Sequence, residues 1–330
     1  MRLLAAADLD RALSYEALVE ALADAFLNTD IAAPVRHRHA VANADGDGSL
    51  LLMPAWTTGG ERYLGSRIAT VFPGNVQRGL PVLHDQYLLM SGESGEALAL
   101  IEGAALAAWR TAGISALASR FLSRPDAAHL VMVGAGALAP HLIRAHASVR
   151  PIRRVTIWNR TTSKAVALGF GLAVTGIEAE VTDDLEAAVR EADIVSCATR
   201  ATAPLIAGEW LKNGTHLDLV GGFTPKMREA DDLAVARARI YVDSRAALKE
   251  AGDLTGPLRK KAIAPEAILG DLRELCRGGL KSRPQGRSLE RSSGQTGASR
   301  ITLFKSVFRP TGNAVEDLAT AMLVWKRRAS

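Results

Sequence analysis

Residues 131–142 combine a short apolar run, two closely spaced glycines and the start of a predicted helix. Gly134 and Gly136 stand in a G-x-G-x-x-A pattern that ends at Ala139. In a strand–turn–helix unit, the first glycine permits the tight turn, the second lets backbone N–H groups approach a pyrophosphate, and the small third residue allows close packing. The anion then lies at a helix N-terminus, which favours negative charge. The pattern predicts a dinucleotide site, although glycine- and alanine-rich turns without a ligand share it.

A second apolar run, at 155–158, follows at about the 20-residue distance typical of a dinucleotide fold. In an NAD site this strand normally ends in Asp or Glu, which binds the ribose 2′-OH, but here Asn159 takes that place. A carboxylate would repel a 2′-phosphate, whereas Arg160, Thr161 and Lys164 offer it charge-assisted hydrogen bonds. We therefore predict NADP(H) as the preferred cofactor and NAD(H) as the second option. The alternative is an exposed basic turn that binds nothing.

The chain of 330 residues is long enough for two domains. Its hydrophobic content of 48% and charged content of 23% are ordinary for a globular protein, and a net charge of +5 suits an anionic ligand without indicating nucleic acid. The two cysteines, Cys197 and Cys276, form neither a disulfide framework nor a metal-ligand spacing, so we predict no metal. The N-terminus does not read as a signal peptide, and no run approaches the roughly 18–20 apolar residues that span a bilayer. We therefore expect a cytoplasmic protein without membrane contact.

The elements that would position these residues follow from hydrophobic periodicity. The first hundred residues predict an amphipathic helix at 8–28 and a mostly antiparallel sheet, and a second helix covers 102–122. From 129 to about 245 strands alternate with helices, which is typical of a doubly wound parallel sheet in an α/β protein. The strands expected in this region are 129–133, 155–158, 179–181, 193–198, 216–220 and 239–243, with one intervening helix at 184–192.

The tract at 277–300 differs from the rest of the chain because it is rich in basic residues, glycine and serine. We interpret it as a mobile, solvated loop. It has no aromatic residue for stacking on bases, so we predict no nucleic-acid partner. A last amphipathic helix is predicted at 314–325.

Several short stretches, taken together and in order, resemble the ornithine cyclodeaminase/mu-crystallin family. Within that family, residues 36–39, 52–56 and 223–229 look most like the bacterial Δ1-pyrroline-2-carboxylate reductases. The stretches that carry the family resemblance are 53–55, 71–75, 79–81, 110–112, 134–136, 192–195 and 315–318.

The resemblance implies a fold in which the middle of the chain is the Rossmann domain. The N-terminal sheet and the last helix would form a second domain that binds substrate and pairs two subunits. We accordingly expect a dimerisation and substrate domain at 1–122 and 305–330, an NAD(P)-binding domain at 123–304, and a homodimer.

The resemblance also implies that cationic residues hold the substrate carboxylate. The matching positions are Arg36, Arg67 and Arg110, and a guanidinium suits this role because it binds a planar carboxylate bidentately. The family usually has Lys where this chain has Arg67, and Arg cannot readily exchange a proton with the substrate nitrogen. Solvent, His39 or His84 must then be considered as the proton source, although each histidine is also interpretable as a surface or structural residue.

Phe223 decides between activities within the resemblance. Cyclodeaminases carry an aspartate at the position after the paired glycines, where it handles protons on the ornithine amines. Here that position, after Gly221 and Gly222, holds Phe223, and a phenyl ring is neither an acid nor a base. Ornithine cyclisation is therefore disfavoured.

The predicted function is NADPH-dependent reduction of a cyclic ketimine, Δ1-pyrroline-2-carboxylate or its six-membered homologue, to L-proline or L-pipecolate. Arg67 and Arg110 are the predicted catalytic residues. Two alternatives stay open: reductive amination of a linear 2-oxo acid, and a non-enzymatic, crystallin-like protein that binds NADP.

Further cofactor contacts are predicted around the glycine turn and near the ends of later strands. Residues 307–313 make a longer stretch than the family usually has before Glu-Asp-Leu, so Lys305 and Ser306 are predicted as weaker contacts. The predicted cofactor contacts are Thr111, Gly134, Gly136, Ala137, Leu138, Asn159, Arg160, Thr161, Lys164, Cys197, Ala198, Thr199, Val220, Gly221, Phe223, Lys305 and Ser306.

Overall fold

The computed structural model describes residues 1–27, 30–43, 46–173, 177–281, 300–306 and 314–328. The chain divides into two compact units, Met1–Thr111 with Arg309–Ser330, and Ala112–Phe308. Helix α3 (Gly103–Leu122) begins in the first unit and continues into the second. The functions assigned above to two domains stay predictions.

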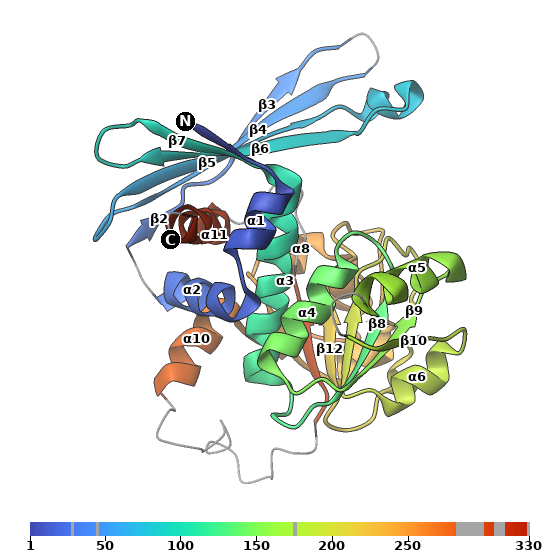
Figure 1. The fold of residues 1–330 in the computed structure, drawn as a ribbon. Coiled ribbons are helices and arrows are strands. Elements are labelled where there is room, and N and C mark those ends of the chain that lie inside the picture. The colour runs from blue at the N-terminus through green and yellow to red at the C-terminus, as the bar shows by residue number, and fades with distance from the viewer. Residues whose placement is uncertain (28–29, 44–45, 174–176, 282–299, 307–313, 329–330) are drawn as a thin grey trace. The chain divides into compact units, whose positions relative to one another are not determined.

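The first unit is built on a sheet that has seven strands within the described residues. Its pairs are antiparallel except that β1 lies parallel to β7 (Figure 1). In sheet order the strands are β1 (Arg2–Leu4), β7 (Ala97–Glu102), β6 (Leu83–Ser91), β5 (Tyr63–Val71), β4 (Gly48–Thr57) and β2 (Ile31–Ala32), with β3 (His37–Val41) also paired to β4. The helices of this unit, besides the start of α3, are α1 (Ala6–Ala12), α2 (Tyr15–Leu27), the 3₁₀ turn η1 (Pro73–Arg78) and α11 (Ala314–Arg327).

One face of this sheet is buried because α11 packs on β4, β5 and β6 and also contacts α2 (Figure 1). The residues on that face alternate along the strands, as the two-residue period requires. Met53, Ala69 and Tyr87 belong to it and are at most 3% exposed. The inner face therefore presents side chains of three neighbouring strands to α11.

Pro54 lies in the middle of β4 without breaking the sheet. Along that edge, β3 pairs with β4 only up to Leu52, and β2 pairs with it from Trp56 onward. Since proline is tolerated where no ladder hydrogen bond is needed, the gap between the two short strands accommodates it.

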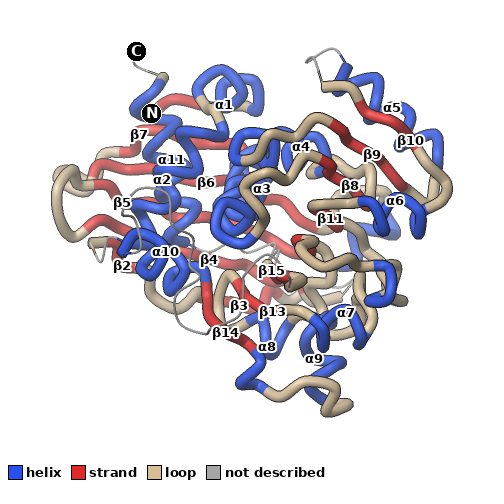
Figure 2. Tube along the Cα trace, turned by 90° about the horizontal axis from the view of Figure 1, so that it is seen from below, coloured by secondary structure: helices blue, strands red, loops and turns tan. Residues whose placement is uncertain are grey.

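The second unit contains a sheet whose strands all run parallel, with eight of them in the described residues. The helices α4, α5 and α6 flank β8, β9 and β10 (Figures 1 and 2). In sheet order the strands are β10 (Ala179–Val181), β9 (Arg154–Trp158), β8 (His129–Val133), β11 (Ile194–Cys197), β12 (His216–Leu219), β15 (Thr302–Lys305), β13 (Arg239–Val242) and β14 (Ile268–Asp271). The helices are α4 (Ala139–Val149), α5 (Thr162–Ala173), α6 (Leu185–Glu191), α7 (Asp232–Arg237), α8 (Ala247–Glu250), α9 (Gly252–Arg259) and α10 (Leu272–Lys281), with 3₁₀ turns η2 (Gly208–Trp210) and η3 (Pro265–Ala267).

The order β10-β9-β8-β11-β12 is that of a doubly wound dinucleotide-binding sheet, so the predicted fold class is confirmed. Two details of the prediction are wrong. The N-terminal helix is two helices, because the chain turns at residues 13–14 and Ser14 caps α2 through the N–H of Ala17 at 3.4 Å. The loop predicted at 277–300 begins inside α10, and residues 282–299 and 307–313 lie outside the described residues.

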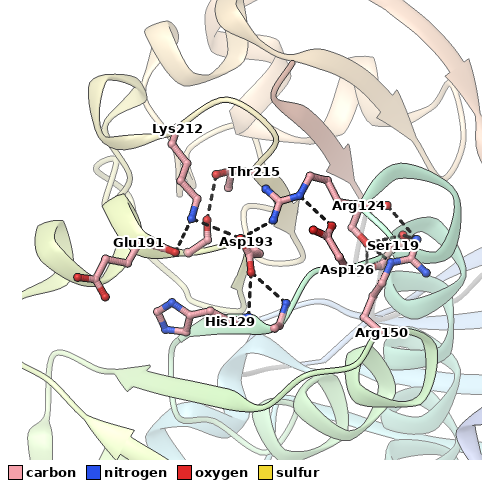
Figure 3. Close-up of polar contacts among 12 residues, drawn as sticks. Ser119, Arg124, Asp126, His129, Arg150, Glu191, Asp193, Lys212 and Thr215 are labelled. Carbon is pink, nitrogen blue, oxygen red and sulfur yellow. Dashed lines mark hydrogen bonds and ion pairs between the residues drawn. The ribbon is translucent and has the colours of Figure 1, made fainter. Parts of the chain in front are cut away.

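A charged cluster at the amino ends of β8 and β11 is centred on Asp193 (Figure 3). Its Oδ2 accepts the N–H groups of Ala128 and His129 at 2.9 and 3.1 Å, and its Oδ1 accepts from Arg124 at 2.9 Å. Lys212 lies 3.3 Å from the same carboxylate. Since ligands of a parallel sheet bind at the carboxyl ends of the strands, this cluster at the opposite edge is structural.

Replacing Asp193 with Asn is expected to lower the free energy of unfolding at neutral pH by about 2 kcal/mol. Burial raises the pKa of Asp193, but the N–H groups of Ala128 and His129 and the charges of Lys212 and Arg124 lower it to about 2. A carboxyl group whose pKa is lowered in the folded state stabilises the fold at pH values above its unfolded-state pKa. This stabilisation is lost as the pH falls toward about 2. Urea unfolding at neutral and acidic pH measures both effects.

The matched control for this test is Asp126→Asn, because the Asp126 side chain is 78% exposed and bonds the same Arg124. It should change the free energy of unfolding by less than about 0.5 kcal/mol. Equal losses in the two variants would contradict the structural role given to Asp193.

Candidate active site

The glycine turn follows β8 and leads into α4. Gly134 has a φ of +109°, and a Cβ there would lie 2.7 Å from the carbonyl oxygen of Ala198. A Cβ on Gly136 would meet nothing within 4 Å, so its backbone is open to a ligand. Ala139 is fully buried at the start of α4. The three small residues thus occupy the three environments that the dinucleotide pattern requires.

Asn159 stands directly after β9, and both ends of its side-chain amide are engaged within the protein. Its Oδ1 accepts the N–H of Ala135 at 3.2 Å, and its Nδ2 donates to the carbonyl oxygen of Thr161 at 2.8 Å. Arg160 and Lys164 are exposed beside it. Asn159 therefore ties the strand end to the glycine turn, and a 2′-phosphate would find its charged partners in Arg160 and Lys164.

The loops after β11 and β12 bring most of the remaining predicted contacts to the same edge of the sheet. Ala198 and Thr199 follow β11, and Val220 follows β12 and donates its N–H to the carbonyl oxygen of Cys197 at 2.8 Å. Adjacent parallel strands end at one edge, so these loops lie beside the glycine turn. The Cys197 side chain is fully buried and faces the core rather than this edge.

Lys305 does not fit its predicted role as a direct cofactor contact. Its side chain is fully buried, and its Nζ donates to the carbonyl oxygens of Leu219, at 3.0 Å, and Gly221. It also lies 3.3 Å from Asp253 Oδ2. The ammonium group is hydrogen-bonded to these carbonyl oxygens and paired with Asp253, so Lys305 supports the loop that follows β12 instead. The adjacent Ser306 is 3% exposed and its predicted contact stays a prediction.

Arg67, from β5, lies on the buried face of the first unit's sheet and is 2% exposed. Its Nε donates to Asp85 Oδ2 at 2.7 Å, its Nη2 donates to the same oxygen, and its Nη1 lies 3.5 Å from Asp317 Oδ2. Burial lowers the pKa of Arg67, but Asp317 and Asp85 raise it above its usual value. The guanidinium therefore keeps its charge and is no proton donor.

Arg110, from α3, shares Asp317 with Arg67. Its Nε lies 3.1 Å from Asp317 Oδ1, and its Nη1 lies 3.3 Å from Glu316 Oε2. Its Nη2 is buried and has no hydrogen-bond partner among the described residues. The structure thus brings together Arg67 and Arg110 through one carboxylate and leaves a cationic N–H donor for a ligand. We call Arg67, Arg110, Asp85, Glu316 and Asp317 the arginine cluster.

Arg36 precedes β3 by one residue and is exposed. Because His37 pairs with Leu52, Arg36 stands next to the position of Met53, which in turn pairs with Arg67. The backbone therefore places Arg36 in the same cross-strand row as Arg67, two strands away.

The two histidines considered as proton donors lie on the other face of the sheet. His39 pairs with Leu50, Leu50 with Thr70, and Thr70 with His84, so all four side chains share one face. Thr70 is three residues from Arg67 along β5, and an odd separation puts two residues on opposite faces. His39 and His84 therefore lie on the face of the sheet opposite the Arg67 side chain.

Thr111 and Tyr87 add two buried hydroxyl groups to this unit that have no hydrogen-bond partner among the described residues. Burial raises the pKa of Tyr87 well above its usual value, and Asp317 raises it further. The phenol therefore stays protonated. Tyr87 pairs with Arg67 across β5 and β6, so it lies next to the arginine cluster.

A Ser–His–Asp group in the second unit is not a hydrolytic site. Asp218 accepts from Ser196 at 2.8 Å, from Ser115 at 3.1 Å, and contacts His146 at 3.2 Å. All four side chains are 0% exposed. They lie within strands and helices rather than at strand ends, so no substrate can reach the hydroxyl groups and the group is part of the core.

Sequence reasoning missed the carboxylates that hold these cations. Asp85 carried one available signal, since it falls on the inward-facing register of β6, between Leu83 and Tyr87. Glu229 and Asp253 gave none, because their positions depend on how distant segments meet. Within the described residues, no group of histidine, cysteine and carboxylate side chains could hold a metal ion.

The model of the ornithine cyclodeaminase/mu-crystallin family matches residues 2–330. The chain is 41% identical over 303 residues to Protein SAR DEFICIENT 4 of Arabidopsis thaliana. The aligned region covers 90% of this chain and 87% of that protein. It is 35% identical over 335 residues to a Δ1-pyrroline-2-carboxylate reductase of Colwellia psychrerythraea, with 100% of both chains covered.

A solved structure shares the fold over nearly the whole chain. It is the Δ1-pyrroline-2-carboxylate reductase of Thermococcus litoralis in complex with NADH and L-proline, at 29% identity and a TM-score of 0.83. The match covers 99% of this chain and 97% of that one.

Proposed function

Because the chain belongs to the ornithine cyclodeaminase/mu-crystallin family, we propose that it reduces a cyclic ketimine carboxylate with NADPH. The chain is an NAD(P)H-dependent oxidoreductase that acts on a carbon–nitrogen bond, as its ketimine reductase relatives are. The proposed substrates are Δ1-pyrroline-2-carboxylate and its six-membered homologue, and the products are L-proline and L-pipecolate. Hydride passes from the cofactor to C2 of the ring, and the ring nitrogen takes one proton.

The arginine cluster is the observation that carries this proposal. It holds two guanidinium groups against three carboxylates, Asp85, Glu316 and Asp317. The buried Nη2 of Arg110 offers a donor for the substrate carboxylate, and nearby carboxylates favour a cationic ring nitrogen. A protonated ketimine carries both charges, and this is the form that accepts hydride more readily. Holding both groups would fix the orientation of the ring, which is catalysis by positioning.

Phe223 separates this proposal from ornithine cyclisation. Its side chain packs against the apolar core of the second unit. Since a phenyl ring cannot take a proton from an ornithine amine, no residue at this position serves the cyclisation chemistry. Ornithine is therefore expected to give no turnover.

The direct test is the loss of reduced-cofactor absorbance when purified protein is mixed with each cyclic ketimine. Turnover with neither ring size would reject the proposal. Reductive amination is the second reading, and it predicts a rate that depends on added ammonia or amine. A protein that binds the cofactor and leaves it unchanged with every substrate would instead be the crystallin-like binder.

NADPH is proposed over NADH because Arg160, Thr161 and Lys164 surround the strand end where a ribose-binding carboxylate would stand. The Thermococcus relative was solved with NADH, so the comparison supports a nicotinamide cofactor and leaves the 2′-phosphate as the point to test. Within the described chain, no helix has the length and apolar character to cross a membrane.

We propose that two copies pair through the outer face of the first unit's sheet, which is the face opposite α11. Along β4, β5 and β6 this outer face carries the apolar side chains of Leu50, Leu52, Trp56, Ile68 and Leu88. Trp56 and Ile68 are 38% and 37% exposed. A contiguous apolar surface of this kind marks an interface.

Ile68→Asp is expected to convert a dimer into a monomer, because it buries an unpaired charge in the proposed interface. Light scattering coupled to size exclusion measures the mass of each species. Phe170→Asp is the matched control, since Phe170 on α5 is 73% exposed and lies in the other unit. A dimer that persists in Ile68→Asp, or is lost equally in both variants, would argue against pairing through the outer face.

A further inference from the structure

Glu229, Asp253 and Lys305 form a buried triad at the carboxyl ends of β11, β12 and β15, and each is 0% exposed. Lys305 Nζ lies 3.3 Å from Asp253 Oδ2. Asp253 Oδ1 accepts the N–H groups of Glu229 and Ala230 at 2.7 and 3.1 Å. Buried charges are tolerated when they are paired and hydrogen-bonded, and Asp253 and Lys305 meet that condition through each other.

The triad is built into two loops that carry predicted cofactor contacts. Glu229 Oε1 accepts the N–H of Thr199 at 2.6 Å and its hydroxyl at 2.8 Å. Lys305 holds the carbonyl oxygen of Gly221. A Cβ on Gly221 would overlap the Glu229 carboxylate, and a Cβ on Gly222 would overlap the Asp253 carboxylate. Both loops therefore rest directly on the triad, which fixes where they present their backbone.

Glu229 is the member of the triad whose charge can change near neutral pH. Burial raises its pKa, the Lys305 charge opposes this, and the Asp253 charge raises it again, so that it reaches about 7. Lys305 from β15 and Asp253 from α9 are the charged groups packed against it among the described residues. The nearby Cys197 thiol does not titrate in this range, because burial raises its pKa well above the usual value.

We propose that Glu229 is a positioning residue of the cofactor site, which holds Thr199 and Gly221 in their binding geometry while its carboxylate is ionised. An ionised carboxylate accepts stronger hydrogen bonds than a neutral one, and it attracts Lys305. Protonation weakens the hold on both loops, so cofactor affinity falls as the pH drops through neutrality. This rests on the proposed function only in that a nicotinamide dinucleotide binds at this edge of the sheet.

The test is a fluorescence titration with NADH in the absence of any substrate, between about pH 6 and pH 8. NADH is the probe because it lacks the 2′-phosphate, whose second ionisation near about pH 6 would overlap. The Kd of the wild-type protein is expected to rise about tenfold toward the acidic end, since a charge-assisted hydrogen bond is weakened. Glu229→Gln should bind NADH at every pH with the weaker affinity that the wild type shows at the acidic end. The matched control is Glu186→Gln, an exposed carboxylate on α6, which should titrate as the wild type does.

Wild-type affinity and an unchanged pH profile in Glu229→Gln would overturn the proposal. A second measurement uses the wild type and needs no variant: calorimetry at pH about 7 in buffers of different ionisation enthalpy. Binding of NADH should release a fraction of a proton, and a release of zero would also overturn it. Neither readout involves a ketimine, so failed imine turnover with intact, pH-dependent NADH binding would reject the proposed function alone.

Discussion

Arg110→Ala is expected to lower kcat/KM for the ketimine roughly a thousandfold, because truncating one member of a buried, hydrogen-bonded charge pair costs about 2–5 kcal/mol. The side chain offers a buried Nη2 that has no hydrogen-bond partner among the described residues, and it also pairs with Glu316 and Asp317. Removing this side chain takes away the hydrogen-bond donor for the substrate carboxylate. It also leaves Glu316 and Asp317 with less positive charge to balance them. Steady-state kinetics at saturating NADPH measures the loss.

Cofactor binding separates a catalytic loss from an unfolded protein. Apart from Thr111, the residues proposed to bind NADPH belong to the second unit, whereas Arg110 belongs to the first, so the Kd for NADPH should change less than about threefold. Arg110→Lys is the matched variant, since it keeps the charge and loses the planar fork; a loss of about a hundredfold is expected. If Arg110→Ala also abolished NADPH binding, or if Arg110→Lys had wild-type activity, the carboxylate-binding role would be wrong.

The parts of the fold that are determined by residues close together in the sequence were predictable. A strand buried on both faces appears as a continuous apolar run, and β8, buried throughout, has the predicted bounds 129–133. The glycine turn was predictable for the same reason, because the chemistry of a tight turn is set by neighbouring residues. β15 was not, since residues 302–305 enter the sheet between β12 and β13 through a crossover that no local pattern records.

The arginines were named from the sequence, whereas the pairing of their carboxylate partners was not. Glu316 and Asp317 stand in the recognisable stretch 315–318, which does not reveal what they pair with, and Asp85 acquires its meaning from the register that sets β5 beside β6. Lys305 was predicted as a weaker cofactor contact because a lysine at the end of a strand suits a phosphate. In the structure its side chain is buried and its Nζ lies 3.3 Å from Asp253 Oδ2. Long-range pairing decides which of two chemically equivalent roles a charged side chain takes.

The combined variant Asn159→Asp, Arg160→Ala is expected to reverse the cofactor preference, with the ratio of NADPH to NADH affinity falling by roughly a thousandfold. Loss of Arg160 removes a charge-assisted hydrogen bond to the 2′-phosphate, worth about 1.5–3 kcal/mol. Asp at 159 keeps an oxygen for the N–H of Ala135, which Asn159 Oδ1 accepts at 3.2 Å. It also adds a charge that repels the phosphate and suits a ribose hydroxyl.

Fluorescence titrations with both reduced cofactors measure this ratio, and the single variant Arg160→Ala should account for roughly 10- to 100-fold of it. Arg153→Ala is the matched control, because Arg153 is also exposed but lies just before β9, at the amino edge of the sheet where no dinucleotide binds. It should leave both Kd values unchanged. If Arg160→Ala weakened NADH and NADPH alike, the side chain would contribute to cofactor binding in general, and the 2′-phosphate would have to be bound elsewhere or not at all. A loss confined to NADPH is therefore the result that ties the basic turn after β9 to cofactor choice.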